Sequence, residues 1–390
     1  MTAAEDTSPA RRPAEEGMAD EAERRFRRHL EGVLGTPATE GNRIDVLRNG
    51  DEIFPSMFDA VEAAERTVDF LTFVYWEGRV GEELAARLCR RAEAGVRVRV
   101  LLDALGARTI DRALIDDMEA AGVDVRWFRP LHRFHLFEAN HRTHRKVMVV
   151  DEAVAFTGGV GIADEWTGDA RDESEWRDTH FRIQGPAVDG LRAAFLDNWS
   201  ETAPGLFSEV DAFPEQPQPG HSVVQCIRGA AETGWSDIDI LLRTLLDLAH
   251  HRIRITTAYF VPDEGLVEAL CQAAARGVEI EILLPGPHVD KRFVQLAGHA
   301  VYDDLVSAGV RIWEFQPSML HAKVMTVDGL VANIGSANIN ARSLAKDEEV
   351  NLVVLDPELV ATLDAHFDDD LRRSERVDPA RWRERPLPQR

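Results

Sequence analysis

Two stretches of the sequence carry the same motif: residues 140–159 read NHRTHRKVMVVDEAVAFTGG, and residues 319–338 read MLHAKVMTVDGLVANIGSAN. Both contain the pattern H-x-K-x4-D, as His144, Lys146 and Asp151 and again as His321, Lys323 and Asp328. The copies lie 177 positions apart, from His144 to His321. In a chain with 13 histidines, one chance match is expected about 0.01 times, so a pair in register indicates a duplicated functional site.

The spacing has a direct structural meaning. Side chains alternate along a strand, so a histidine and a lysine two positions apart point to the same face. The apolar runs VMVV and VMTV that follow predict a buried strand in each copy. If the copies are related by an approximate two-fold axis, two imidazoles and two ammonium groups converge on one spot.

The surrounding sequence repeats as well, at an offset of about 182 positions. In the first copy, strands are predicted at 68–76, 96–102 and 121–128 and helices near 53 and at 81–95. The counterparts are strands at 253–261, 278–284 and 308–315 and helices at 237–250 and 265–277. Strands that alternate with helices predict an α/β fold with parallel neighbours, here two similar α/β/α lobes with one site at their interface.

Composition shifts suggest four segments along the chain. Residues 1–42 are polar and predicted to form a flexible tail, although Phe26, Leu30 and Leu34 would share one face of a short helix. The lobes are expected at 43–205 and 206–370, separated by the Pro-rich stretch 204–220. Residues 371–390 hold seven arginines against three acids and are predicted to be an Arg-rich C-terminal tail.

The bulk composition narrows the function classes. A net charge of −23 counts against general nucleic-acid binding, which requires many cations to neutralise phosphates. Three cysteines argue against a disulfide framework and favour a reducing compartment. No apolar run approaches the roughly 18 residues of a membrane-spanning helix, and no signal peptide is evident. Only four of the 45 basic residues are lysines, and two of these lie in the motifs.

Two histidines and two lysines suit chemistry at a phosphodiester. The lysines would hold the non-bridging oxygens, one neutral histidine would attack phosphorus, and one protonated histidine would donate to the leaving alkoxide. We predict no metal and no cofactor. His141 and His144 match the spacing of a zinc pair, but no third ligand has suitable spacing.

At this level of detail, the chain resembles the phospholipase D superfamily, whose members carry paired HKD motifs. The resemblance covers about residues 45–370 and is closest to the bacterial cardiolipin synthase branch, without its transmembrane helices. The stretches that carry it are NHRTHRKVMVVD, AFTGGVGIADEW, WRDTHFRIQGPAV, LHAKVMTVD, GSANINARS and EEVNLVV. It implies two phospholipase D-like lobes related by a pseudo-two-fold axis.

The resemblance also implies roles for particular residues. One histidine should form a covalent phosphohistidine, and His144 is favoured; the other should act as general acid and base. The motif lysines should grip the phosphate with Asn338, Ser336 and, through its backbone N–H, Gly161. In the family, a carboxylate about 30 positions downstream orients each imidazole. Asp178 and Glu349 fit, 34 and 28 residues after His144 and His321 respectively. Asp151 and Asp328 would shape the loop within each motif.

Some features depart from the family or remain open. The synthases usually have G-G-x-N in the first copy, whereas this chain ends that run with Gly161. The aromatic stretches 73–78 and 258–263 could contact lipid or simply pack in the core. His132 and His135 could line the site, although a solvated loop is the more common outcome.

These observations favour a phosphatidyltransferase of cardiolipin synthase type that acts on phosphatidylglycerol or a similar phospholipid. The alternative within the same chemistry is a phospholipase D hydrolase, in which water replaces the acceptor alcohol. A nuclease is less consistent with the net charge of −23. A non-catalytic scaffold is less consistent with the presence of two intact motifs. We expect a cytoplasmic protein that associates peripherally with a membrane surface and has no nucleic-acid partner.

Overall fold

The computed structural model describes residues 13–130, 141–202, 213–229 and 236–378. The strands of the first half are β1 (Thr39–Arg48), β2 (Thr67–Thr72), β3 (Arg97–Asp103), β4 (Asp124–Phe128), β5 (Val147–Val150), β6 (Val154–Gly158) and β7 (Thr179–Gln184). Those of the second half are β8 (Ser222–Gly229), β9 (Arg252–Thr256), β11 (Glu279–Pro285), β12 (Arg311–Phe315), β13 (Val324–Val327), β14 (Val331–Gly335), β16 (Glu349–Leu355) and β17 (Ser374–Arg376). A separate parallel pair joins β10 (Phe260–Val261) to β15 (Ile339–Asn340).

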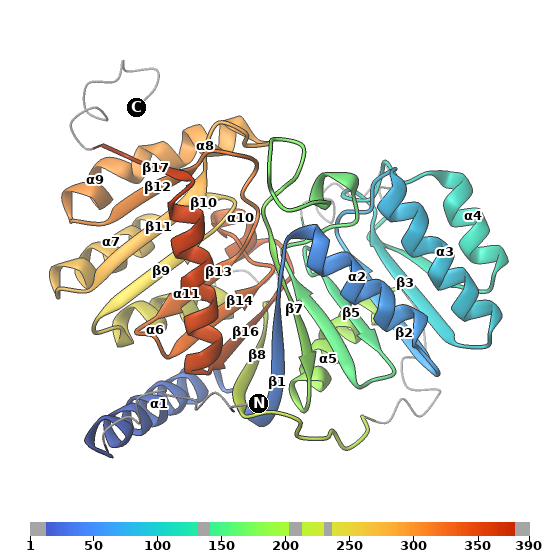
Figure 1. Ribbon diagram of the computed structural model, residues 1–390, viewed down its shortest axis with the longest axis horizontal. Helices are drawn as coiled ribbons and strands as arrows, with labels where there is room; N and C mark the ends of the chain where they lie inside the picture. The colour runs from blue at the N-terminus through green and yellow to red at the C-terminus, as the bar shows by residue number, and fades with distance from the viewer. Residues whose placement is uncertain (1–12, 131–140, 203–212, 230–235, 379–390) are drawn as a thin grey trace, which may run out of the picture.

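The strands of both halves form one continuous sheet across the molecule (Figure 1). Its order is β17-β12-β11-β9-β13-β14-β16-β8-β1-β7-β6-β5-β2-β3-β4. Read outwards from the central pair β8–β1, equivalent strands occupy equivalent places, and β17 adds an edge strand to the second half. The pairs β2–β3, β3–β4, β9–β11 and β11–β12 are parallel, whereas the strands nearer the centre are antiparallel. The palindromic order agrees with the predicted pair of related α/β lobes.

Helices cover both faces of the sheet. The first half carries α2 (Asn49–Glu62), α3 (Arg79–Glu93), α4 (Arg112–Ala120), η2 (Asp164–Trp166) and α5 (Ala187–Ser200). The second half carries α6 (Asp237–Leu248), α7 (Glu264–Ala275), α8 (Arg292–Gly298), η3 (His299–Val301), α9 (Tyr302–Ser307), α10 (Ala341–Ala345) and α11 (Pro357–Leu371). Successive residues of β2 point to opposite faces and show the layering: Phe70 packs in the cluster of α2 and α3, and Leu71 packs with α5.

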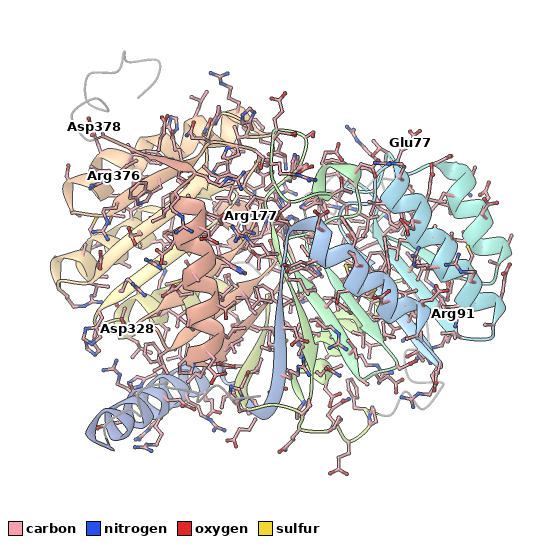
Figure 2. All side chains as sticks on the ribbon, in the orientation of Figure 1. Glu77, Arg91, Arg177, Asp328, Arg376 and Asp378 are labelled. Atoms are coloured by element: carbon pink, nitrogen blue, oxygen red, sulfur yellow. The ribbon has the colours of Figure 1, made fainter. Side chains whose placement is uncertain are left out.

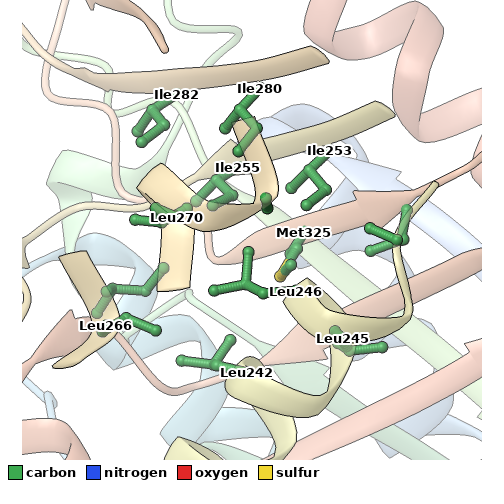
Figure 3. Packing of buried hydrophobic residues seen from close by; sticks show 14 of the residues in the cluster. Leu242, Leu245, Leu246, Ile253, Ile255, Leu266, Leu270, Ile280, Ile282 and Met325 are labelled. Carbon is green, nitrogen blue, oxygen red and sulfur yellow. The ribbon is translucent and has the colours of Figure 1, made fainter. Parts of the chain in front are cut away.

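The repeated apolar patterns account for these layers. Strands β5 and β2 are buried along their whole length, as expected for the central strands of a sheet covered on both faces. In the second half, Leu242, Leu245 and Leu246 of α6 pack against Ile253 and other residues of the neighbouring strands (Figure 3). The helix α6 begins at a Ser236 cap, whose side chain accepts from the backbone N–H of residue 239.

Several contacts join the halves at the seam. Strand β1 pairs antiparallel with β7 on one side and with β8 on the other. Arg177, near the centre of Figure 2, is 3% exposed and its Nε donates to Asp370 Oδ2 at 2.9 Å. Arg177 belongs to the first half and Asp370 to the second, so this buried ion pair is a direct contact between the halves.

The structure corrects the predicted tails. Residues 13–42 are not a flexible tail, because α1 (Pro13–Leu34) buries Phe26 and Leu30 in the core of the second half and β1 already begins at Thr39. At the other end, β17 pairs with β12 and Val377 is buried, so the folded part extends past residue 370. Within the predicted linker, residues 204–212 lie outside the described part, as do residues 1–12 and 379–390.

None of the helices within the described residues is both long enough and apolar enough to span a bilayer.

Candidate active site

Both motif histidines lie at the seam, each just before a central strand of its own half. Each is tied by its backbone to the opposite half: His144 N donates to Glu348 O at 2.8 Å, and His321 N donates to Arg177 O at 2.7 Å. Single bridges at Thr143–Glu348 and Arg177–Leu320 extend these contacts. The two halves therefore position each other's histidine through equivalent contacts.

The two candidate carboxylates also cross the seam. Glu349, in β16 of the second half, accepts from His144 Nδ1 with its two oxygens at 3.0 and 3.1 Å. Asp178, in the first half, lies with Oδ2 2.9 Å from His321 Nδ1. The pairing expected from chain order was therefore wrong, because each carboxylate contacts the histidine of the other copy. A carboxylate at Nδ1 fixes the tautomer and leaves Nε2 free to react.

Asp178 is held as a carboxylate. Trp166 Nε1 donates to its Oδ2 at 2.8 Å, and the Thr179 N–H donates to Oδ1 at 2.8 Å. Burial opposes ionisation, but His321, Lys323 and Trp166 outweigh it and lower the pKa of Asp178 to about 2. Gly159 permits this approach, since a Cβ there would lie 2.2 Å from Asp178 Oδ1.

Glu349 sits in a different environment. The Ser336 hydroxyl donates to its Oε2 at 2.6 Å, and burial raises the pKa of the Glu349 carboxyl. Ser336 is fully buried, and its hydroxyl is engaged by this carboxylate and by the Val350 backbone. The prediction that Ser336 binds phosphate is therefore corrected: its hydroxyl positions the carboxylate that contacts His144.

The motif lysines lie against the same two histidines. Lys146 Nζ donates to His144 O at 2.8 Å, and Lys323 Nζ is 2.9 Å from His321 Nδ1 and 3.2 Å from Nε2. Burial lowers the pKa of both lysines, that of Lys323 to about 7. Burial and the neighbouring lysines lower the pKa of His144, and burial and Lys323 lower that of His321 to about 3. Two neutral imidazoles next to two ammonium groups form a site made for an anion.

A cavity of about 370 Å³ opens onto these groups. It is lined from both halves by Phe73, Val74, Trp76, Leu105, Gly106, Arg108, Thr109, His144, Lys146, Trp166, Trp176, Tyr259, Asp290, Lys291 and His321. The aromatic stretches that the sequence left open divide between cavity and core: Phe73, Trp76 and Tyr259 line the cavity, whereas Tyr75 and Phe260 are buried in the core.

Two further predicted phosphate ligands occupy equivalent places in the two halves. Asn338 is 2% exposed, and within the described part its Oδ1 has no hydrogen-bond partner; this oxygen is an acceptor, so a phosphate would have to bind at the Nδ2 donor instead. At Gly161, a Cβ would lie 2.7 Å from the Cβ of Val74, so no asparagine fits there without displacing the cavity wall. Phosphate binding by Asn338 and by the Gly161 backbone remains a prediction.

The motif aspartates lie away from the cavity. Asp151 accepts from the backbone N–H groups of Glu65, Arg66 and Thr67 at 2.9, 2.7 and 2.9 Å. Asp328 makes the same three bonds, at 2.8 to 2.9 Å, to residues 250–252, and Figure 2 shows it far from the central Arg177. Both have positive φ, 50° and 54°, where a short polar side chain is tolerated. Loop shaping therefore accounts for their place in the motif, and their inclusion among catalytic residues is corrected.

Asp151→Ala tests that assignment. Loss of a charged acceptor that serves three backbone donors is expected to lower the free energy of unfolding by about 3 kcal/mol. Urea unfolding would measure this change, and activity per folded molecule should fall much less than in a histidine variant. Full stability with lost activity would instead place Asp151 in the chemistry.

The pH dependence of anion binding follows from the lysines. Because burial lowers the pKa of Lys323 to about 7, its ammonium is present below that pH and lost above it. Binding of a soluble glycerophosphodiester, whose own charge stays constant, should be strongest below about pH 7 and weaken by up to about tenfold per pH unit above it. Titration calorimetry measures this, with Lys323→Met as the control that removes the step. Affinity that rises with pH would contradict the assignment.

Sequence reasoning missed several residues that hold the site. Arg145, inside the first motif, is fully buried and donates to Glu349 O at 3.2 Å and to Gly229 O at 3.2 Å in the other half. Trp166 lies in the quoted run ADEW but received no role. A charged residue between two buried motif positions was the available signal for Arg145.

The sequence also raised three other histidines as candidates: His141, His132 and His135. His141 Nδ1 is 3.2 Å from Lys346 O, and no cluster of three metal-binding side chains occurs among residues that the structure describes. His132 and His135 lie outside the described residues.

The comparisons with known proteins agree with this geometry. A family model described as cardiolipin synthase, PLD-like domain, matches residues 57–178 and 242–371. Cardiolipin synthase of Geobacillus kaustophilus is 34% identical over 354 residues, which are 90% of this chain and 70% of that protein. The probable cardiolipin synthase YwiE of Bacillus subtilis is 32% identical over 369 residues, or 94% and 73% of the two chains.

Among solved structures, phosphatidylserine synthase of Haemophilus influenzae has the same fold, with a TM-score of 0.69, 15% identity and 92% of each chain covered. A polyphosphate kinase of Porphyromonas gingivalis shares it at a TM-score of 0.59 and 15% identity, over 87% of this chain and 49% of that chain. With paired H-x-K motifs at one seam and relatives matched over most of its length, this chain belongs to the cardiolipin synthase family of phospholipase D-like enzymes.

Proposed function

We propose that the protein transfers a phosphatidyl group from one phospholipid to a hydroxyl of a second, through a phosphohistidine, and that cardiolipin is the product. The observation that carries the proposal is the crossed pair of histidine–carboxylate contacts at one cavity. Each imidazole has its Nδ1 engaged by a carboxylate, which makes Nε2 the reacting nitrogen in both halves of a double displacement; the Nε2 of His321 lies 3.2 Å from Lys323 Nζ.

The different carboxylate environments support different roles for the two histidines. The ionised Asp178 stabilises an imidazolium at His321, which suits proton transfer. The Glu349 carboxyl is more readily protonated, so its support for positive charge on His144 is weaker. His144 therefore acts as the nucleophile, in its neutral form, and His321 as general acid and then general base.

The steps balance as follows. His144 Nε2 bonds to phosphorus while the bond to the leaving glycerol oxygen breaks, and His321 gives that oxygen its proton. The bound phosphodiester carries the negative charge that offsets the lysines and allows His321 to hold this proton. The acceptor hydroxyl then returns a proton to His321 as its oxygen bonds to phosphorus, and neutral His144 leaves.

A phospholipase D reaction would use water in the second step. The aromatic rings around His321 favour transfer, since the centroids of Trp166, Trp176 and Tyr259 lie 5.1, 5.6 and 6.2 Å from that of its imidazole. Apolar walls limit the access of water to a reactive intermediate.

Product analysis separates the two reactions. The protein is incubated with phosphatidylglycerol vesicles, with EDTA present and glycerol varied, and the products are identified by mass spectrometry. Cardiolipin plus glycerol is the expected result. Phosphatidic acid plus glycerol would make the protein a hydrolase, and no turnover would exclude this lipid as the donor.

We further propose that the protein works as a peripheral membrane protein through α8. Phe293 and Leu296 of this helix are 73% and 45% exposed, which is unusual for such large apolar side chains. The helix follows Lys291, which lines the cavity, so side chains inserted into a bilayer would bring the opening to its lipid. Arg292, the first residue of the helix, adds positive charge next to them, which favours an anionic surface.

Replacing both apolar residues, Phe293→Ser and Leu296→Ser, is expected to weaken sedimentation with phosphatidylglycerol vesicles by about tenfold or more. Val33→Ser, at a side chain of α1 that is 48% exposed, is the matched control and should leave binding unchanged. Equal sedimentation of all three proteins would rule out α8 as the docking element.

A further inference from the structure

Lys291 lies in the cavity but belongs to neither motif. It directly precedes α8, in the loop after β11, and its Nζ lies 4.8 Å from the ring centroid of Tyr259. The same ring lies 6.2 Å from the imidazole of His321. The Tyr259 ring is thus a neighbour of both the Lys291 ammonium and the imidazole of His321, the proposed general acid, and all three side chains line the cavity.

Arg108 occupies the matching place in the first half, in the loop after β3, and also lines the cavity. It is exposed, and no carboxylate pairs with it among the residues of the described ranges. Strands β3 and β11 are equivalent in the two halves, so the pseudo-two-fold places one extra cation on each side of the opening.

Asp290 is the single carboxylate among the described residues of the lining. Its two oxygens accept from the Tyr259 hydroxyl at 2.8 Å, and its Oδ2 lies 3.9 Å from Lys291 Nζ. An exposed pair at that distance is weak, so Lys291 keeps most of its capacity to bind an anion. Asp290 and Tyr259 instead fix the place from which the ammonium reaches into the cavity.

A transfer between two phospholipids brings two phosphates into this space. The motif lysines, Lys146 and Lys323, bind the phosphate that reacts. The acceptor lipid carries its own phosphodiester, separated from its attacking hydroxyl only by the glycerol head group, and two like charges so close repel strongly in a partly dry cavity. Additional cations are needed at that distance, whereas water or free glycerol as acceptor carries no charge and needs none.

We propose that Lys291 and Arg108 form a second anion site, which binds the phosphate of the acceptor lipid. This inference rests on the proposed transferase function. It explains how one phosphohistidine is passed to a lipid in preference to a small alcohol. Without these cations, the choice between acceptors shifts towards uncharged ones.

The test measures how the intermediate partitions between two acceptors. Phosphatidylglycerol vesicles are supplied with isotopically labelled glycerol, and mass spectrometry gives the ratio of cardiolipin to labelled phosphatidylglycerol. Both products arise from the same intermediate, so the ratio does not depend on donor binding. Lys291→Met should lower the ratio at least about tenfold, and the double variant with Arg108→Met further. Lys346→Met, an exposed lysine outside the cavity, is the matched control.

The outcomes are distinguishable. An unchanged ratio in Lys291→Met, whether total turnover falls or not, would overturn the second anion site and leave the transferase function intact. Wild-type protein that yields phosphatidic acid without cardiolipin would overturn the proposed function, and the acceptor site with it. An equal shift in Lys346→Met would mean that general surface charge, and not the cavity, sets the ratio, which also overturns the inference.

Discussion

His144→Ala is expected to lower phosphatidyl transfer by about 10⁴-fold or more, because no nucleophile remains to form the covalent intermediate. His321→Ala should be nearly as inactive with natural phospholipid, since the alkoxide leaves poorly without a proton. The two variants should separate when the donor carries p-nitrophenol as its leaving group. This group departs as a stable anion and needs no general acid.

With that donor, His321→Ala is expected to release one p-nitrophenolate per active site and then stop. His144 can still attack, but no base remains to activate the acceptor, so the phosphohistidine accumulates. His144→Ala should release none. Stopped-flow absorbance measures the burst, and mass spectrometry under alkaline conditions locates the phosphoryl group. A burst in His144→Ala and none in His321→Ala would reverse the two roles.

The repeated motif and the flanking elements were predictable because their signals are local. The two H-x-K-x4-D runs and the alternating apolar strands need only neighbouring residues to be recognised. The strands at 96–102 and 278–284 were found as β3 and β11 within one residue at each end. The burial of α1 was not predictable, since its apolar stripe is short and its partner helix α6 lies far along the chain.

The carboxylate that contacts each imidazole could not be predicted from the sequence, for a different reason. The contacts His144–Glu349 and His321–Asp178 span 205 and 143 positions, and chain order suggests the opposite, shorter pairing. Only a two-fold arrangement that exchanges partners across the β1–β8 seam produces the observed contacts. Lys291 was visible as one of four lysines, but its place near His321 depends on how the strands of the second half are ordered in the sheet, where β9 lies between β11 and β13.

The crossed contacts lead to an expected result that chain order would reverse. Asp178→Asn should slow transfer by about 10²- to 10⁴-fold, because the amide no longer supports a proton on His321. If Asp178 serves the general acid, most of this defect should disappear with the p-nitrophenyl donor in the first step. The change keeps the size of the side chain, but the new NH2 group faces the N–H of either Thr179 or Trp166, so some loss of stability is expected and the rate is compared per folded molecule.

Glu349→Gln is the matched variant from the other half, and it should behave differently. It disturbs His144, whose attack on phosphorus is needed for every donor, so the better leaving group should not restore the burst. Each carboxylate is thus expected to share the phenotype of the histidine in the opposite half: Asp178→Asn that of His321→Ala, and Glu349→Gln that of His144→Ala. If Asp178→Asn instead behaved like His144→Ala, and Glu349→Gln like His321→Ala, each carboxylate would act on the histidine of its own half during the reaction. The expected assortment requires both halves for every step, since neither contains a histidine together with the carboxylate that contacts it.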